Sequence, residues 1–157
     1  MRDKDGISAC LQLARFAAER KADGSSLRAV LDELACEFGL YATSPLTIRV
    51  DDLATITTGM ANLRERGVDS LAGSPVIETT DLTNGSEQLD LPGTDALIFR
   101  TESDDRVVAR PSGTEPKLKC YCEVVIPVSD GNVDAARTQA AERLERVKTD
   151  LRAALGV

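Results

Sequence analysis

The chain has 157 residues, of which 42% are hydrophobic and 29% are charged, and its formal net charge is −7 at pH 7. The composition is ordinary for a globular protein, but an acidic chain repels the phosphates of nucleic acids and acidic lipid surfaces. No apolar run approaches the ~18 residues of a membrane-spanning helix, and "MRDKDGISAC" has no signal-peptide pattern. We therefore expect a cytoplasmic protein that binds neither nucleic acid nor membrane.

The cysteine and histidine content excludes some kinds of catalytic and metal site. There are four cysteines and no histidine, so Ser-His and Cys-His nucleophilic pairs are excluded from this chain. Cys120 and Cys122 are two residues apart in a β-rich segment, and side chains at that spacing share one face of a strand. Without histidine or a second cysteine pair in tandem, a zinc site is not expected. Small buried thiols in a reducing compartment are expected instead.

Two helices are expected at the start of the chain. In residues 7–22 the polar side chains form one narrow stripe at helical spacing, and almost everything else up to residue 18 is apolar. Such a helix is buried nearly all round, which predicts contacts with protein that this chain need not contain. A second helix is expected at about 26–38, and Gly39 is a suitable stop for it.

A strand and a third helix are expected next. β-branched residues predict the strand at about 46–50, and the helix follows at about 53–66. Asp51 or Asp52 caps the start of this helix, and Gly67 ends it. Four apolar side chains at helical spacing should face inward, namely Leu53, Ile56, Met60 and Leu63.

The rest of the chain is expected to form a sheet and a long helix. The strands should lie at 74–82, 96–102, 105–111 and 117–128, with an exposed, turn-rich segment at 83–95. A helix at about 132–155 follows the cap Asn132, and its apolar side carries Val133, Ala136, Ala140, Leu144, Val147, Leu151 and Leu155. This order predicts an α+β fold, in which a helical pair precedes a mostly antiparallel sheet of four to five strands with helices on one face.

The turn before the last strand carries an unusual group of small and polar residues. The stretch "ARPSGTEPKLKCYCEV" (109–124) places Ser112, Gly113 and Thr114 between two prolines. Gly113 can adopt a positive φ, which lets successive N–H groups converge on an anion. The hydroxyl groups of its two neighbours add further donors.

The charges beside this turn are mostly positive. Between positions 106 and 119 there are four basic residues and one acidic residue, in a chain that is acidic overall. The planar guanidinium of Arg110 can donate to two phosphate oxygens at once. Lys119, on the strand that follows the turn, can direct its ammonium group to the same anion. Two interpretations follow from the residues alone: a local anion-binding site, and an ordinary hairpin turn with charges on a solvated face.

Two motifs resemble those of a known family. "RPSGTEPKLKCYCEV" is similar to the C-terminal phosphate-binding loop of the α-D-phosphohexomutases, which include phosphoglucomutase, phosphomannomutase and phosphoglucosamine mutase. The opening "RDKDGISACLQLARFAAERKADGSSLRAVLDELACEFG" is similar to the end of that family's third domain. "DKDG" alone is a weak signal, but both motifs in order, about 105 residues apart, are specific. The resemblance covers essentially the whole chain.

The resemblance implies a domain division and a set of site residues. Residues 1–40 match the helical end of the third domain, and 41–157 match the C-terminal phosphate-binding domain, which is TBP-like. The residues that match the loop holding the phosphate of a sugar phosphate are Arg110, Ser112, Gly113 and Thr114, with Lys119 as a further candidate. Lys4, in "DKDG", matches a lysine near the family's active site, and the alternative for it is a solvated helix start. No metal ligand is expected in this chain.

Members of the family resembled shift a phosphoryl group between two positions of a sugar phosphate, using a phosphoserine and a Mg²⁺ ion held by earlier domains. The Ser-His-Asn and Asp-Gly-Asp loops that supply them are absent from this sequence. The resemblance therefore implies a C-terminal fragment that binds no Mg²⁺, contains no catalytic residue and is inactive without the missing N-terminal domains. The alternative is a stand-alone, non-catalytic module for phosphosugar binding or for assembly.

Overall fold

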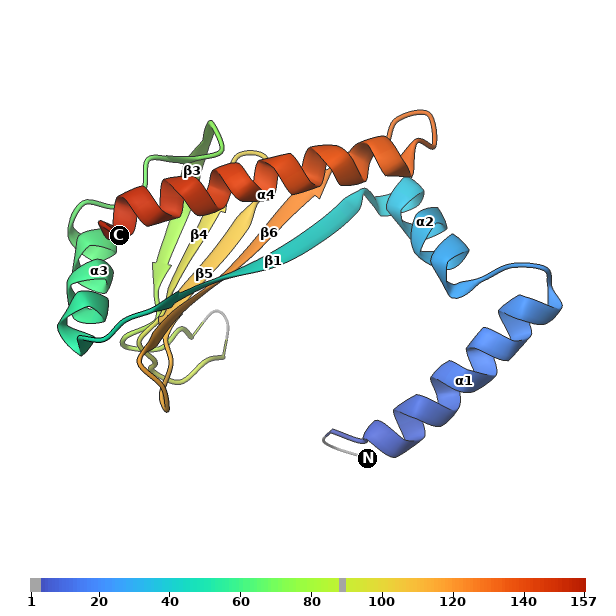
Figure 1. Ribbon diagram of the computed structural model, residues 1–157, viewed down its shortest axis with the longest axis horizontal. Coiled ribbons are helices and arrows are strands. Elements are labelled where there is room, and N and C mark those ends of the chain that lie inside the picture. Colours follow the sequence, from blue (N-terminus) through green and yellow to red (C-terminus); the bar gives the residue numbers. More distant parts are fainter. Residues whose placement is uncertain (1–3, 88–89) are drawn as a thin grey trace.

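The structure is a computed structural model that describes residues 4–87 and 90–157. These residues form four helices and a six-strand sheet (Figure 1). The elements are α1 (Gly6–Ala22), α2 (Leu27–Phe38), β1 (Leu40–Arg49), α3 (Leu53–Glu65), β2 (Ser70–Leu71), β3 (Ser74–Asp81), β4 (Leu97–Thr101), β5 (Arg106–Pro111), β6 (Lys117–Ile126) and α4 (Val133–Leu155). The first residue of "DKDG" and two residues of the expected 83–95 turn segment lie outside the described residues.

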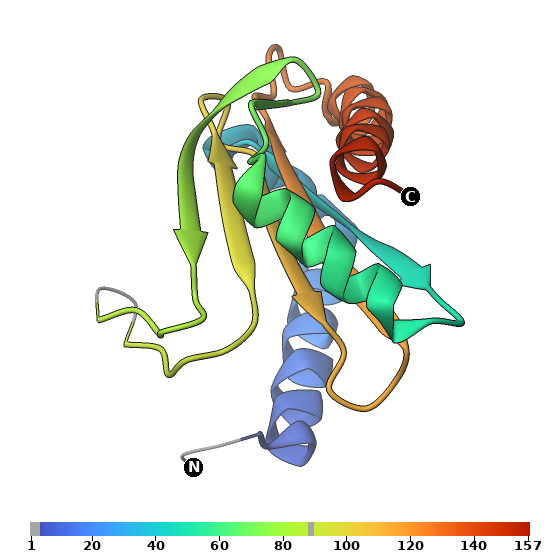
Figure 2. The same cartoon turned by 90° about the vertical axis from the view of Figure 1, so that its left-hand side faces the viewer.

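The strands lie in the order β1-β6-β5-β4-β3-β2, and every neighbouring pair is antiparallel. α3 and α4 cover one face of this sheet (Figure 2), where their apolar residues join those of the strands in one core. The predicted α+β class and the placement of the helices on one face are confirmed, although the sheet has six strands rather than four to five. No helix among the described residues covers the opposite face.

The core confirms most of the predicted inward-facing residues. All seven apolar residues predicted on one side of the last helix are buried. In α3, Ile56, Met60 and Leu63 are buried, but Leu53 is 63% exposed. The prediction for Leu53 is wrong because this residue opens the helix, beyond the point where the helix meets the core. Cys120 and Cys122 are buried as expected, at 0% and 1% exposure.

One predicted strand needs correction, and one strand was not predicted. The strand predicted at about 46–50 begins at Leu40, because the whole segment pairs with β6 from Leu40 opposite Ile126 to Arg49 opposite Lys117. Pro45 lies within it and lacks a backbone donor, which an edge strand tolerates. The two-residue strand β2 was not predicted, since so short a segment shows no alternation.

The buried ion pair of Asp105 and Arg143 ties the sheet to α4. Asp105, at the β4–β5 turn, is 0% exposed, and the Arg143 Nε lies 3.1 and 2.9 Å from its two carboxylate oxygens. The Asp105 N–H also donates to the Thr101 hydroxyl at 3.1 Å. This turn is thereby fixed against the helix that covers the sheet.

The first two helices form an arm that extends away from the sheet (Figure 1). α1 has no buried residue, and α2 has only Ala35. Ile7 is 80% exposed and Leu11 is 68% exposed, so the burial expected of the first helix is not supplied by this chain. The arm joins the sheet at Gly39, whose φ of 90° provides the turn between α2 and β1.

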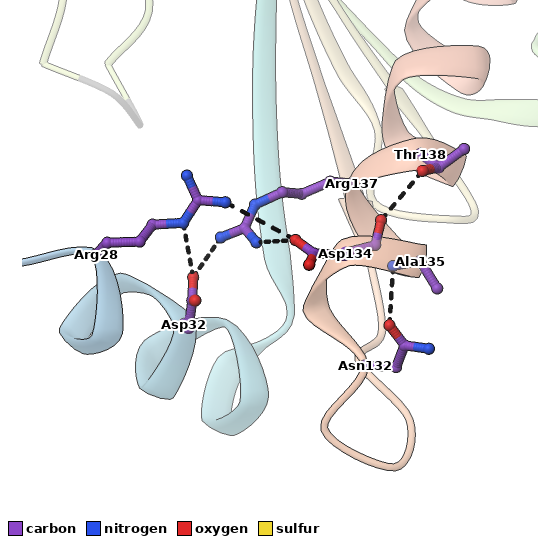
Figure 3. A network of polar contacts seen from close by, with 7 residues as sticks. All are labelled: Arg28, Asp32, Asn132, Asp134, Ala135, Arg137 and Thr138. Atoms are coloured by element: carbon purple, nitrogen blue, oxygen red, sulfur yellow. Dashed lines mark hydrogen bonds and ion pairs between the residues drawn. The ribbon is translucent and has the colours of Figure 1, made fainter.

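Ion pairs connect α2 to the start of α4 (Figure 3). Arg137 donates to Asp32 and, at 2.7 Å, to Asp134. Arg28 lies 3.2 Å from Asp32 and 3.8 Å from Asp134. The bond from Arg137 lowers the pKa of Asp32 below its ordinary value. A hollow of about 700 Å³ lies between the two elements, so charged side chains rather than close apolar packing make much of this contact.

Candidate functional site

The predicted anion site lies at the end of the β5–β6 hairpin. The Ser112 N–H donates to the Lys117 carbonyl at 2.8 Å, and the Lys117 N–H donates to the Glu115 carbonyl at 2.7 Å. The Val50 N–H donates to the Pro116 carbonyl at 3.2 Å, which ties the turn to the end of β1. The base of the turn is therefore fixed, while Gly113 and Thr114 at its tip are exposed.

The basic side chains next to the turn point to the open face of the sheet. In β5 and β6, Ala109, Leu118 and Cys120 are buried toward the helices, and alternate residues of a strand point to opposite faces. Arg110 and Lys119 consequently lie on the open face. They are directly opposite each other in the β5–β6 register, so the structure brings these two candidates together beside the turn.

A second pair of like charges lies in the same place. Arg49 of β1 is directly opposite Lys117 of β6, and like charges at opposed positions destabilise a sheet. Lys117 is compensated by Glu115, whose carboxylate lies 2.5 Å from its Nζ. That contact, with Lys119 and Arg49 nearby, lowers the pKa of Glu115. Sequence reasoning missed Arg49, because only the pairing of β1 with β6 brings it to the site.

The remaining cations of this cluster have no acidic partner in the described part of the chain. Arg49, Arg110 and Lys119 have no carboxylate within ion-pair distance there. Arg106, on the same face of β5, is by contrast paired with Glu123 at 3.2 Å. Three positive charges outside any such ion pair therefore gather beside the turn, in a chain whose net charge is −7. Such an arrangement suits a compact anion that carries more than one negative charge.

Arg110 contacts an aromatic residue, Tyr121, on the neighbouring strand. Its guanidinium carbon lies 5.8 Å from the centre of the Tyr121 ring, and its Nη2 donates to the Tyr121 hydroxyl at 3.4 Å. The hydrogen bond from Arg110 lowers the pKa of Tyr121. Tyr121 is 44% exposed on the open face, and sequence reasoning did not single it out.

Gly113 does not have the positive φ that was expected from the sequence. Its φ is not in the left-handed region, and a Cβ added there would meet nothing within 4 Å. Neither backbone conformation nor packing within the chain therefore requires a glycine at this position. The N–H groups of Gly113 and Thr114 also lack a hydrogen-bond partner among the described residues. Close approach of a ligand to the backbone would account for a glycine at this place.

The structure does not bring Lys4 to this turn. Lys4 is exposed just before α1, and the start of that helix lies well apart from the β5–β6 turn (Figure 1). A hollow of about 300 Å³ does lie beside the turn, between Ser112 and the first turns of α3. Leu53 lines this hollow, which is where its unexpected exposure places it.

Metal ligands and membrane-spanning helices were sought among the described residues. The part of the chain that the structure describes holds no group of three or more His, Cys, Asp or Glu side chains that could bind a metal ion. Within the same residues, no helix has the length and apolar content needed to cross a membrane.

Comparisons with known proteins agree with this architecture. Parafusin, a phosphoglucomutase from Paramecium solved in an open form, aligns over 100% of this chain and 29% of its own, with a TM-score of 0.62 and 18% identity. At that identity the match shows the fold alone. Among curated relatives, a probable phosphomannomutase of Haemophilus influenzae is 38% identical over 123 residues, 78% of this chain and 24% of its own length. A phosphopentomutase of Mus musculus is 31% identical over 150 residues, 84% of this chain and 23% of its own length.

The family model assigns the chain directly. The model described as "Phosphoglucomutase/phosphomannomutase, C-terminal domain" matches residues 47–143, which include the β5–β6 turn and all four cations of the cluster. The chain spans about a quarter of the length of the curated relatives that it matches. The chain therefore belongs to the phosphoglucomutase/phosphomannomutase family and contains its C-terminal domain.

Proposed function

We propose that this chain binds the phosphate group of a sugar phosphate during an intramolecular phosphoryl transfer. The residues proposed to hold the phosphate are Arg110, Ser112, Gly113, Thr114 and Lys119, and Arg49 adds charge. The observation that carries the proposal is the pairing of like charges across the strands beside a turn with free N–H donors. That arrangement is unfavourable within the fold alone, and a bound phosphate dianion would relieve it. The relatives are named as phosphomutases, which act on such compounds.

The partners proposed for the chain are the N-terminal domains of a whole phosphohexomutase. Residues 1–40 would then be the helical end of the preceding domain, and 41–157 the phosphate-binding domain. The exposed apolar side chains of the α1–α2 arm support this division, because they need cover from further protein. Those earlier domains would also supply the nucleophile and the Mg²⁺ ligands. Four free cysteines fit the reducing cytoplasm proposed for such an enzyme.

A titration of the 157-residue chain tests the phosphate site. Glucose 6-phosphate is added to ¹⁵N-labelled protein, and the amide signals of the 112–116 turn are followed by NMR. We expect a Kd of roughly millimolar, because a few charge-assisted hydrogen bonds must offset the loss of freedom on binding. Arg110→Ala should weaken binding about tenfold or more. Arg106→Ala is the matched control, since that arginine lies on the same strand and face but is paired with Glu123.

Two results would contradict the proposal. If Arg110→Ala binds as tightly as the original chain, or if Arg106→Ala weakens binding equally, the site is not at this turn. Turnover of glucose 1-phosphate to glucose 6-phosphate by the pure chain would show that it needs no further domains. A stable dimer in light scattering, formed through the α1–α2 arm, would favour the alternative of a stand-alone binding or assembly module.

A further inference from the structure

The Arg110 side chain lies next to another cation, which affects its conformation in the free protein. Arg110 lies directly opposite Lys119, and the repulsion between two cations favours conformers that carry the flexible arginine away from the lysine. Arginine also has a large rotamer freedom, which binding must remove. A side chain that takes part in holding an anion therefore benefits from a neighbour that holds it on the open face in the free protein.

Tyr121 is in the position to do this. It lies two residues beyond Lys119 on β6, opposite Val108, and so is the diagonal neighbour of Arg110. Diagonal neighbours on a sheet are within reach of aromatic and long side chains. Arg110 and Tyr121 make two contacts of different kinds. The guanidinium lies over the ring, with its carbon 5.8 Å from the ring centre, and the Arg110 Nη2 donates a hydrogen bond to the Tyr121 hydroxyl at 3.4 Å.

These contacts leave most of the guanidinium available. Arginine has five N–H donors, and the hydroxyl of Tyr121 takes one of them. An aromatic ring attracts a cation through its face, so the stack holds the group without using the remaining donors along its edge. Arg110 has no carboxylate partner in residues 4–87 and 90–157 that would compete with an anion.

We propose that Tyr121 is a positioning residue for the anion site: it holds the Arg110 guanidinium in one arrangement on the open face, so that an arriving phosphate meets a guanidinium that is already ordered. The inference rests on the proposed function. Tyr121 acts through Arg110 and need not touch the phosphate itself. An Arg110 side chain that is ordered before binding loses less entropy when phosphate binds. Tyr121 should therefore increase the affinity for phosphate, and this effect should depend on Arg110.

The test uses the full chain, inorganic phosphate as the probe and NMR as the readout. Tyr121→Leu should weaken phosphate binding about two- to fivefold, the range of an exposed cation–π contact, whereas Tyr121→Phe, which keeps the ring, should remain within about twofold of the original affinity. The matched control is Tyr41→Leu, because Tyr41 is the other tyrosine and lies exposed on the same face. In the Arg110→Ala background, Tyr121→Leu should have no further effect.

A second readout follows Arg110 directly. The ring current of Tyr121 is expected to shift the Arg110 Hε resonance in the free chain, and this shift should disappear in Tyr121→Leu and persist in Tyr121→Phe. Thermal unfolding of each variant separates loss of order at Arg110 from loss of the fold. A merely structural role for Tyr121 would not produce an effect that vanishes in the Arg110→Ala background.

The outcomes separate this inference from the proposed function. Phosphate binding by Tyr121→Leu that equals or exceeds that of the original chain overturns the inference, and tighter binding would mean that Tyr121 withholds Arg110 from the anion. Equal weakening by Tyr41→Leu overturns it too. If instead the original chain and Arg110→Ala bind phosphate equally, the proposed site itself fails, whatever the Arg110 resonance shows.

Discussion

Replacing Gly113 with alanine should distinguish an effect on ligand binding from an effect on the stability of the fold. The φ of Gly113 is outside the left-handed region, and an added Cβ would meet no heavy atom within 4 Å. Alanine fits that backbone and restricts the unfolded chain, so Gly113→Ala should raise the free energy of unfolding by about 0.4–1 kcal/mol. For a chain of this length, that corresponds to a melting temperature higher by roughly 1–4 °C.

The same methyl group should weaken phosphate binding. If a phosphate oxygen approaches the turn backbone closely, a Cβ at position 113 must displace it or distort the turn, and overpacking of this kind typically costs about 1–3 kcal/mol. We therefore expect a Kd for glucose 6-phosphate at least about fivefold higher than that of the original chain. A variant that is more stable and yet binds more weakly would be hard to explain by damage to the fold.

Gly73→Ala is the matched control for this experiment. Gly73 also has open space around an added Cβ, but its φ is +79°, and it lies in the β2–β3 turn. Alanine there should cost about 1–2 kcal/mol of stability and leave phosphate binding unchanged. The reasoning about Gly113 is refuted if Gly113→Ala destabilises the chain as Gly73→Ala does. It is equally refuted if the affinity for glucose 6-phosphate does not change.

Three further predictions concern the fold. Asp105→Ala should destabilise the chain by about 3–5 kcal/mol in urea unfolding, because it leaves Arg143 partly buried without its partner; a loss below 1 kcal/mol would contradict this. The pKa of Asp81 is lowered to about 2 from 3.8, first by its bond from Arg64, so its contribution to stability is present above pH 4 and is lost as the pH falls through 2. The stability difference between the original chain and Asp81→Asn should shrink over that window, and a constant difference would contradict the assignment. Burial raises the pKa of two thiols to about 12 and about 11, so a thiol reagent at pH 8 should modify two sites in the folded chain and four after unfolding. The two protected thiols should be Cys120 and Cys122, and the two reactive ones Cys10 and Cys36.

The helices were predictable because each carries its own signals. The last helix shows apolar residues at a helical period over its whole length and a capping Asn132, whose side chain accepts from the Ala135 N–H at 3.1 Å. Asp52, one of the two residues expected to cap α3, does so, and Ser26 caps α2. Such signals are local, so they survive without knowledge of the tertiary structure.

The extent of β1 was not predictable in the same way. Its first half, from Leu40 to Pro45, alternates only loosely and contains a proline, which argues against a central strand. It is a strand because β6, far along the sequence, provides a partner for ten consecutive residues. Pairing over such a separation leaves little trace in a local pattern, and the same limit hid the third uncompensated cation, Arg49, from sequence reasoning.

The candidate site was foreseen from residue types rather than from geometry. Arg110, Ser112, Gly113, Thr114 and Lys119 were singled out because their side chains and backbone suit an anion, and the structure places all five at one end of one hairpin. The expected positive φ at Gly113 is not found. No backbone strain and no close neighbour within the described residues requires a glycine there. This could not be predicted from the sequence, because it depends on the atoms that surround the turn.

The contrast between local and overall charge bears on selectivity. The chain is acidic, with a net charge of −7, while the cluster of Arg49, Arg110, Lys117 and Lys119 is locally positive. Screening at physiological salt reduces fields beyond about 8 Å, so a small phosphate within that range responds mainly to the cluster. A long polyanion would also interact with the rest of the chain, whose net charge of −7 repels it. The proposed site therefore suits a compact phosphate monoester better than a nucleic acid.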